Sequence, residues 1–132
     1  MRIGLLLIGA AAVAGCAPAA PVERTAEAQT HLDKVLAGRV AGPPQNCLNQ
    51  FRTRDMITID DNTVVFKVGS TYYRNDFRSE GCSQLSRPGS AMVTKSPTTQ
   101  LCSGDIITIN DTASGMMLGA CSFGEFVPYR KA

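Results

Sequence analysis

The sequence has no tryptophan, only one histidine and no Cys-x-x-Cys motif. Without tryptophan, an aromatic core has to come from the five phenylalanines and three tyrosines. The single histidine, His31, disfavours a Ser/His/Asp or Cys/His catalytic set, and the missing Cys-x-x-Cys argues against a zinc knuckle or a thioredoxin-like redox pair. We therefore expect no catalytic residue, no metal site and no cofactor, and we interpret His31 as a solvent-exposed helix residue.

Charge of one sign does not gather in any run. The chain has 13 Lys and Arg against 11 Asp and Glu, which gives a formal net charge of +2. Such a balance gives no indication of nucleic-acid binding or of steering toward acidic lipids. The apolar run at residues 3–13 is shorter than the roughly 20 residues that a helix needs to span a bilayer.

The N-terminus has the parts of an export signal. Arg2 is the positively charged start, residues 3–13 are apolar, and small residues follow. The motif Val13-Ala14-Gly15-Cys16 resembles the lipobox of bacterial lipoproteins. That resemblance implies diacylglycerol on the Cys16 thiol, cleavage before Cys16 and acylation of the new amine. The alternative is an ordinary secretory cleavage site next to an unmodified cysteine.

The same resemblance implies a location. Two or more acyl chains hold a protein firmly on a membrane, whereas one chain binds only marginally. Residue 17 is alanine rather than aspartate. Among lipoproteins of Gram-negative bacteria, this favours the outer membrane over the inner one. We expect a lipid-anchored protein of the cell envelope, at the periplasmic face of the outer membrane.

The cysteine count fits this interpretation. Without Cys16, an even set of four remains: Cys47, Cys82, Cys102 and Cys121. In an oxidising compartment these predict two disulfides, each contributing about 2–4 kcal/mol. Four cysteines allow three pairings. We favour Cys82–Cys102, which closes a proline-containing loop, with Cys47–Cys121, which ties the first strand to the last.

The chain divides into four predicted regions: a leader at 1–15, a lipidated Pro/Ala tether at 16–22, a helix and linker at 23–46, and a disulfide-linked β domain at 47–132. The helix is expected over residues 23–37 because Leu32, Val35 and Leu36 have helical spacing. Gly38 is expected to end it, and Gly42-Pro43-Pro44 breaks any continuation.

Three segments of the β domain alternate as strands do: 56–60, 63–68 and 71–75. Two-residue turns at Asp61-Asn62 and Gly69-Ser70 would set Ile57 opposite Phe66, and Phe66 opposite Tyr73. One face of this meander is then apolar, and its members are Ile57, Ile59, Val64, Phe66, Val68 and Tyr73.

The opposite face carries Lys67, Tyr72 and Arg74. One interpretation is a contact surface for a protein partner, centred on Tyr72 with a cation on each side. The other is the ordinary solvated face of a half-buried sheet. In both cases we expect truncation of Tyr72 to change the melting temperature little.

A weak internal repeat relates residues 55–61 to residues 105–111, each ending in an Asp- or Asn-rich turn. Either two similar hairpins close on each other, or turn chemistry alone makes the two segments alike. The predicted fold is mainly β, a small antiparallel barrel or sandwich with one N-terminal helix, linked by disulfides.

Several short motifs of the domain occur in a recurring order: Cys47-Leu48, residues 57–66, Tyr73-Arg74-Asn75, Cys82, residues 101–105, Gly119-Ala120-Cys121, Gly124-Glu125-Phe126 and Pro128. This order is similar to an uncharacterised family of small exported proteins and lipoproteins of Gram-negative bacteria. The resemblance implies a compact, disulfide-linked envelope domain, and it supplies no catalytic residue.

Two functions are therefore expected. The first is a non-enzymatic envelope lipoprotein that binds a partner or supports the cell surface. The alternative is a lipid-anchored inhibitor of an exogenous hydrolase such as lysozyme, similar in format to small β-barrel inhibitors.

Overall fold

The computed structural model describes residues 24–49, 55–78 and 82–132. The predicted leader, the tether and Cys16 lie outside the described residues. The elements, in chain order, are α1 (Ala26–Val35), β1 (Arg39–Ala41), β2 (Cys47–Asn49), β3 (Asp55–Thr58), β4 (Thr63–Val68), β5 (Thr71–Asp76), β6 (Ser90–Thr94), β7 (Gln100–Cys102), β8 (Ile106–Asp111), β9 (Met117–Ser122) and β10 (Phe126–Lys131).

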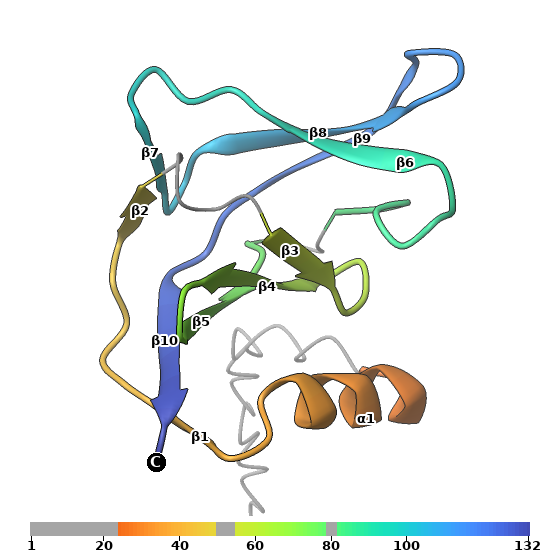
Figure 1. Cartoon of the computed structure of the whole chain (residues 1–132). Helices are drawn as coiled ribbons and strands as arrows, with labels where there is room; N and C mark the ends of the chain where they lie inside the picture. The colour runs from red at the N-terminus through yellow and green to blue at the C-terminus, as the bar shows by residue number, and fades with distance from the viewer. Residues whose placement is uncertain (1–23, 50–54, 79–81) are drawn as a thin grey trace, which may run out of the picture.

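The described chain forms three layers (Figure 1). A five-stranded antiparallel sheet, in the order β1-β10-β5-β4-β3, lies in the middle. The three-stranded sheet β6-β8-β9 packs on one of its faces and α1 on the other, while β2 and β7 pair at one end. The sheets do not close into a barrel, so the sandwich form of the predicted β fold is confirmed. Part of the expected linker, β1, belongs to the middle sheet.

Helix α1 is capped at both ends. The Thr25 hydroxyl accepts a hydrogen bond from the Ala28 N–H at 3.2 Å, which satisfies one of the free donors of the first turn. Glu27 in the first turn and Lys34 in the last complement the helix dipole. Gly38, with φ of +69°, takes the left-handed conformation that commonly ends a helix. The helix therefore lies within the range predicted for it.

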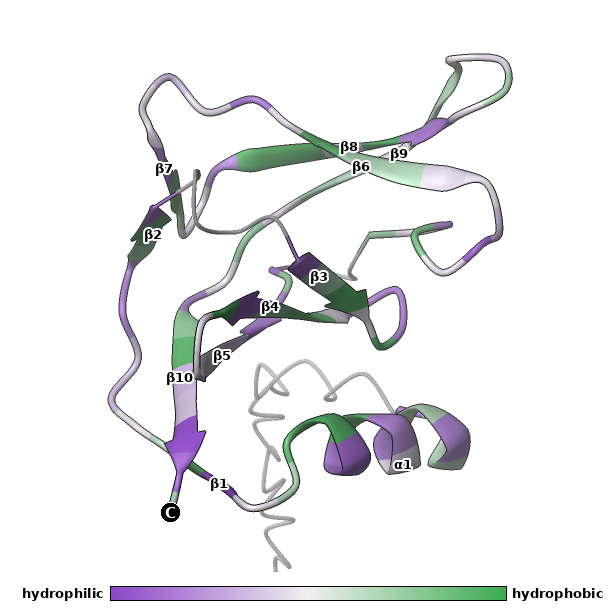
Figure 2. Cartoon of the chain, viewed as in Figure 1, coloured by the Kyte–Doolittle hydropathy of each residue, from purple (hydrophilic) through white to green (hydrophobic). Residues whose placement is uncertain are grey.

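The main core fills the space between the two larger sheets. Phe123 is its centre: its ring centroid lies 5.4 Å from that of Phe126 and 6.0 Å from that of Phe66. Figure 2 shows the hydrophobic colour concentrated on strands such as β4 and β8, whereas most of α1 is hydrophilic. A second, smaller cluster lies under α1 and contains Leu32, Ile59 and Val65. Both faces of the middle sheet are therefore buried in part.

The predicted register between the first two strands of the meander is wrong by one residue. Ile57 lies opposite Val65, and Met56 lies opposite Phe66. The connection is a longer loop, because the Asp60 carboxylate accepts the backbone N–H groups of Asn62 and Thr63, each at 2.8 Å. A shift of one residue moves a side chain to the other face of a strand.

The shift divides the predicted apolar face. Ile57 and Ile59 join the cluster under α1 instead of the main core, whereas Val64, Phe66 and Tyr73 belong to the main core. The register across the next turn is as predicted, with Phe66 opposite Tyr73 and Lys67 opposite Tyr72.

The two segments of the internal repeat lie in opposite sheets, and each leads into a hairpin, β3–β4 and β8–β9. Asp60 closes the first loop as described above. Asp111 closes the second, where its carboxylate accepts the N–H groups of Ala113 at 2.8 Å and of Ser114 at 2.9 Å. These backbone hydrogen bonds lower the pKa of Asp111. Similar turn chemistry therefore occurs in both hairpins.

Both disulfides form, but the favoured pairing is wrong. The bonds are Cys47–Cys102 and Cys82–Cys121. Cys47 and Cys102 are direct neighbours across the β2–β7 pair, with Cα atoms 4.0 Å apart. Cys82 is fully buried in the main core, where it meets Cys121 of β9. The pairing follows the long-range pairing of strands, which the sequence spacing does not encode.

A buried carboxamide holds the crossover from β9 to β10. Asn75 is fully buried, and its Nδ2 donates to the Gly124 carbonyl at 2.9 Å. The Gly124 N–H donates to Asn75 Oδ1 at 3.1 Å. A Cβ at residue 124 would overlap with the backbone carbonyl oxygen of Asp76, so only glycine fits at this close approach.

We therefore expect Gly124→Ala to lower the free energy of unfolding by about 3 kcal/mol or more, since backbone and not a flexible side chain has to move. Gly69→Ala is the matched control. Gly69 has φ of +59° and open space around it, so this variant keeps only the backbone strain, about 1 kcal/mol. Urea unfolding of both variants measures the difference, and equal losses would contradict the close approach.

Candidate functional site

Two of the three predicted contact residues lie together. Lys67 of β4 and Tyr72 of β5 are direct neighbours. Arg39 comes from β1, an edge strand that β10 separates from β5 in the same sheet. The Arg39 guanidinium carbon lies 3.6 Å from the centroid of the Tyr72 ring, and Lys67 Nζ lies 5.4 Å from it. Both distances are within the range of cation–π attraction. We call Arg39, Lys67 and Tyr72 the Tyr72 patch.

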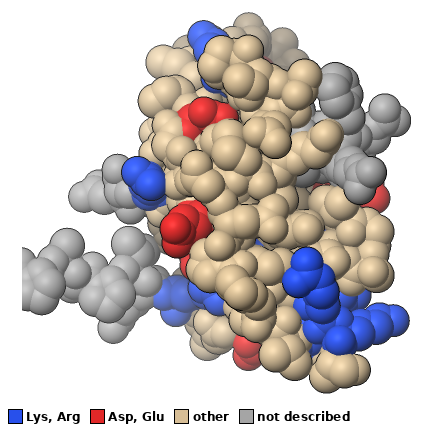
Figure 3. Space-filling view, turned by 90° about the vertical axis from the view of Figure 1, so that its left-hand side faces the viewer, with Lys and Arg blue, Asp and Glu red and all other residues tan. Residues whose placement is uncertain are grey.

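Sequence reasoning missed Arg39, which belongs to the region expected to be a linker. Its position depends on the pairing of β1 with β10, and a three-residue strand has too little alternation to be found from sequence. Its Nη1 also donates to the Ser70 carbonyl at 2.6 Å, which fixes the guanidinium above the ring. Basic side chains gather in the lower part of the face that Figure 3 shows.

The third predicted residue, Arg74, is engaged elsewhere. Its guanidinium pairs with Asp76, with Nη2 3.0 Å from Oδ2 and Nε 3.1 Å from Oδ1. Burial lowers the pKa of Arg74, but the hydrogen bond and the charge of Asp76 outweigh it, so the pKa is raised. Arg74 is therefore half of an ion pair and not a cation beside Tyr72.

The sheet face that carries Tyr72 is not a simple solvated face. Val65, which lies on the same face, is fully buried, and α1 covers it through Leu32. Tyr72 itself is half-buried and packs against this cluster. Truncation of Tyr72 should therefore cost stability, contrary to the expectation that it changes the melting temperature little.

The segment that precedes α1 is fixed to the sheet by an ion pair. Arg24 Nε lies 3.0 Å from Asp60 Oδ2, and its Nη2 donates to the Thr63 hydroxyl and lies 3.7 Å from Asp76 Oδ1. The Arg24 and Asp60 side chains are 17% and 19% exposed, so the pair is shielded from water on most sides. The chain that leads from Cys16 therefore joins the domain at a fixed point.

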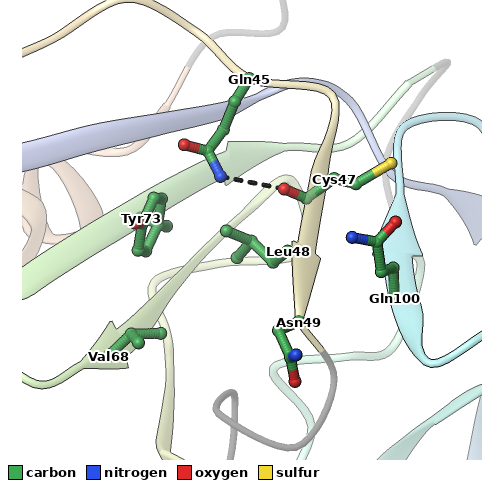
Figure 4. A pocket seen from close by; sticks show the side chains of 7 residues that line it. All are labelled: Gln45, Cys47, Leu48, Asn49, Val68, Tyr73 and Gln100. Carbon is green, nitrogen blue, oxygen red and sulfur yellow. Dashed lines mark hydrogen bonds between the residues drawn. The ribbon is translucent and has the colours of Figure 1, made fainter.

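A cleft of about 390 Å³ opens where β2 and β7 meet the ends of β4 and β5 (Figure 4). Its lining residues are uncharged, and they are Gln45, Cys47, Leu48, Asn49, Val68, Tyr73 and Gln100. Leu48 points from β2 toward Tyr73, and the Gln45 Nε2 donates to the Cys47 carbonyl at 2.9 Å. Sequence reasoning missed this cleft because its walls come from four separate strands.

The sole histidine is exposed, as expected. His31 borders a second, more open hollow of about 370 Å³, beside Glu27 and Asp60. Among residues 24–49, 55–78 and 82–132, no group of three or more His, Cys, Asp or Glu side chains could hold a metal ion. In the same part of the chain, no helix is long and apolar enough to cross a membrane.

Comparison of the chain with protein-family models, with curated proteins and with solved structures gave no match. The resemblance to small exported proteins therefore stays a prediction.

We expect Tyr72→Ala to lower the free energy of unfolding by about 2 kcal/mol, because it removes a half-buried ring from the cluster under α1. Tyr72→Phe is the matched control and should stay within about 0.5 kcal/mol, since it keeps the ring. Thermal or urea unfolding compares the two variants. If Tyr72→Ala were as stable as the parent protein, Tyr72 would lie on a solvated face after all.

Proposed function

We propose that this protein is an exported, lipid-anchored protein of the cell envelope whose β domain is a non-enzymatic binding module. One observation carries the proposal. All four cysteines of the β domain are used in two disulfides, so Cys16, directly after Val13-Ala14-Gly15, is the fifth. Four of the five cysteines thus form structural bonds, and the fifth needs another role, for which lipid modification is the one proposed.

The two disulfides support export. Such bonds persist in oxidising compartments and are rare where glutathione and thioredoxin keep thiols reduced. A domain of this size also buries a modest fraction of its surface, so covalent links add stability that a small core does not supply. Both considerations favour a domain that works outside the cytoplasm.

The short segment before the domain supports anchoring close to a membrane. Between Cys16 and Arg24, a fully extended chain spans at most about 30 Å. Arg24 is fixed to Asp60 on the domain, so this length sets how far the domain can move from the lipid. In the proposed arrangement the domain stays within about one domain diameter of the periplasmic face of the outer membrane.

The Tyr72 patch is the proposed contact for an envelope partner. Tyrosine and arginine are enriched among residues that dominate binding energy at interfaces. In the patch, Arg39 and Lys67 hold two positive charges beside one ring, which suits an acidic group on the partner. Arg74, although predicted to be a contact, is the weakest of the candidates because Asp76 already neutralises it.

The anchor is tested by Cys16→Ser. We expect this variant to lose incorporation of radiolabelled palmitate and to leave the membrane fraction, because a serine hydroxyl cannot form the thioether. The double variant Cys47→Ser/Cys102→Ser is the matched control, since it also replaces cysteine by serine but keeps Cys16 and should keep the label. An exported Cys16→Ser protein that stays membrane-bound would refute the proposed anchor.

The partner contact is tested by charge reversal. We expect Lys67→Glu to reduce recovery of an envelope partner in crosslinked pull-downs by about tenfold. The melting temperature should fall by only a few degrees, because the new carboxylate would lie opposite Asp55 on the neighbouring strand. Lys95→Glu, an exposed site near the other sheet, should recover the partner normally. Equal recovery with both variants would place the contact elsewhere. A lysozyme inhibition assay on the parent protein tests the inhibitor alternative.

A further inference from the structure

The cleft in Figure 4 has the dimensions of a small-molecule site. Its volume of about 390 Å³ lies within the roughly 300–1,000 Å³ that ligand pockets occupy. It lies between two different sheets: the β2–β7 pair forms one wall, and the ends of β4 and β5 in the five-stranded sheet form the other. The Cys47–Cys102 disulfide fixes the first of these walls. The cleft is therefore a feature of the fold and not a gap under a single side chain.

Three residues that line the cleft carry carboxamides, and Tyr73 adds a hydroxyl. Gln45 and Asn49 come from β2 and the residues just before it, Gln100 comes from β7, and the three side chains line the same space. Each carboxamide carries both donors and an acceptor. None of the seven lining residues is charged. Among the described residues that line the cleft, no side chain could form an ion pair with a charged ligand, so this lining fits a neutral molecule.

The remaining part of the cleft is apolar. Tyr73 presents an aromatic ring, and Leu48 and Val68 place aliphatic carbons next to it (Figure 4). Leu48 is only 5% exposed and belongs to the main core, so this surface is rigid. The ligand therefore needs an apolar face of its own, together with groups that both donate and accept hydrogen bonds.

We propose that the cleft binds a neutral saccharide. A sugar ring has a face of C–H groups, which would lie against Tyr73, and a rim of hydroxyls, which pair with carboxamides because both donate and accept hydrogen bonds. The ligand of the proposed binding module would then be a neutral sugar. The inference rests on the proposed function only in treating the β domain as a binding module, and it requires neither the lipid anchor nor the Tyr72 patch.

An extended peptide fits less well. A peptide that adds to the edge of β2 would need the backbone groups of that strand, and β2 has only three residues. The Cys47 carbonyl, moreover, already accepts a hydrogen bond from the Gln45 side chain on the cleft side. A peptide would have to displace this bond before the strands could pair.

The test uses the full exported chain as Cys16→Ser, so that neither lipid nor anchoring affects the measurement. Saturation-transfer NMR with maltotriose, cellotriose and triacetylchitotriose should detect binding of at least one of them, with a Kd of about 1 mM. A neutral peptide rich in serine and threonine is the competing probe. Binding of the peptide alone, or of none of the three sugars to the folded protein, would overturn the proposal.

Variants locate the binding. Gln100→Ala removes one carboxamide from an exposed position of β7 and should weaken binding of the sugar about tenfold, as expected for loss of a hydrogen bond. Thr99→Ala, on the adjacent exposed residue outside the cleft lining, is the matched control and should bind as the parent does. Equal weakening in both variants, or in neither, would place the sugar elsewhere. Failure here would leave palmitate labelling of Cys16 unaffected, so the two proposals are tested separately.

Discussion

The chain passes from one sheet of the sandwich to the other at Gly124, and the Asn75 carboxamide fixes this passage. Its donor and its acceptor are both used on Gly124, and Nδ2 also lies 3.4 Å from the Glu125 carbonyl. A buried amide left without partners would cost about 1–3 kcal/mol, so the crossover has one favourable position. Phe123 and Phe126 flank it, and this position sets both rings into the core. The packing of the two sheets thus depends on one polar contact.

The sequence predicted contacts between residues that are close along the chain better than contacts between distant residues. The β4–β5 hairpin was predictable because Gly69-Ser70 leaves one two-residue turn and fixes Phe66 opposite Tyr73. The preceding register was not, because the Asp60 carboxylate organises a longer loop than the two-residue turn that its composition also fits. The same turn residues are compatible with both loop lengths, and packing of Ile57 in the cluster under α1 is a long-range contact that favours the observed one.

The candidate sites depended even more on long-range pairing. Lys67 and Tyr72 could be placed together from the hairpin alone, whereas Arg39 reaches Tyr72 only after β1 has paired with β10. The disulfides show the same limit, since Cys47 meets Cys102 through a strand pair of three residues each. Short strands carry little periodicity, so their partners follow from the completed fold and not from local pattern.

The Cys47–Cys102 bond links the structure of the cleft to the oxidation of the chain. It joins the two strands that form one wall of the cleft, and within the described part of the chain these strands form a sheet of two. A newly made chain with reduced thiols would have no covalent hold on that wall. The wall therefore gains its covalent link only when the two thiols are oxidised, so that the shape of the cleft becomes sensitive to the redox state of its surroundings.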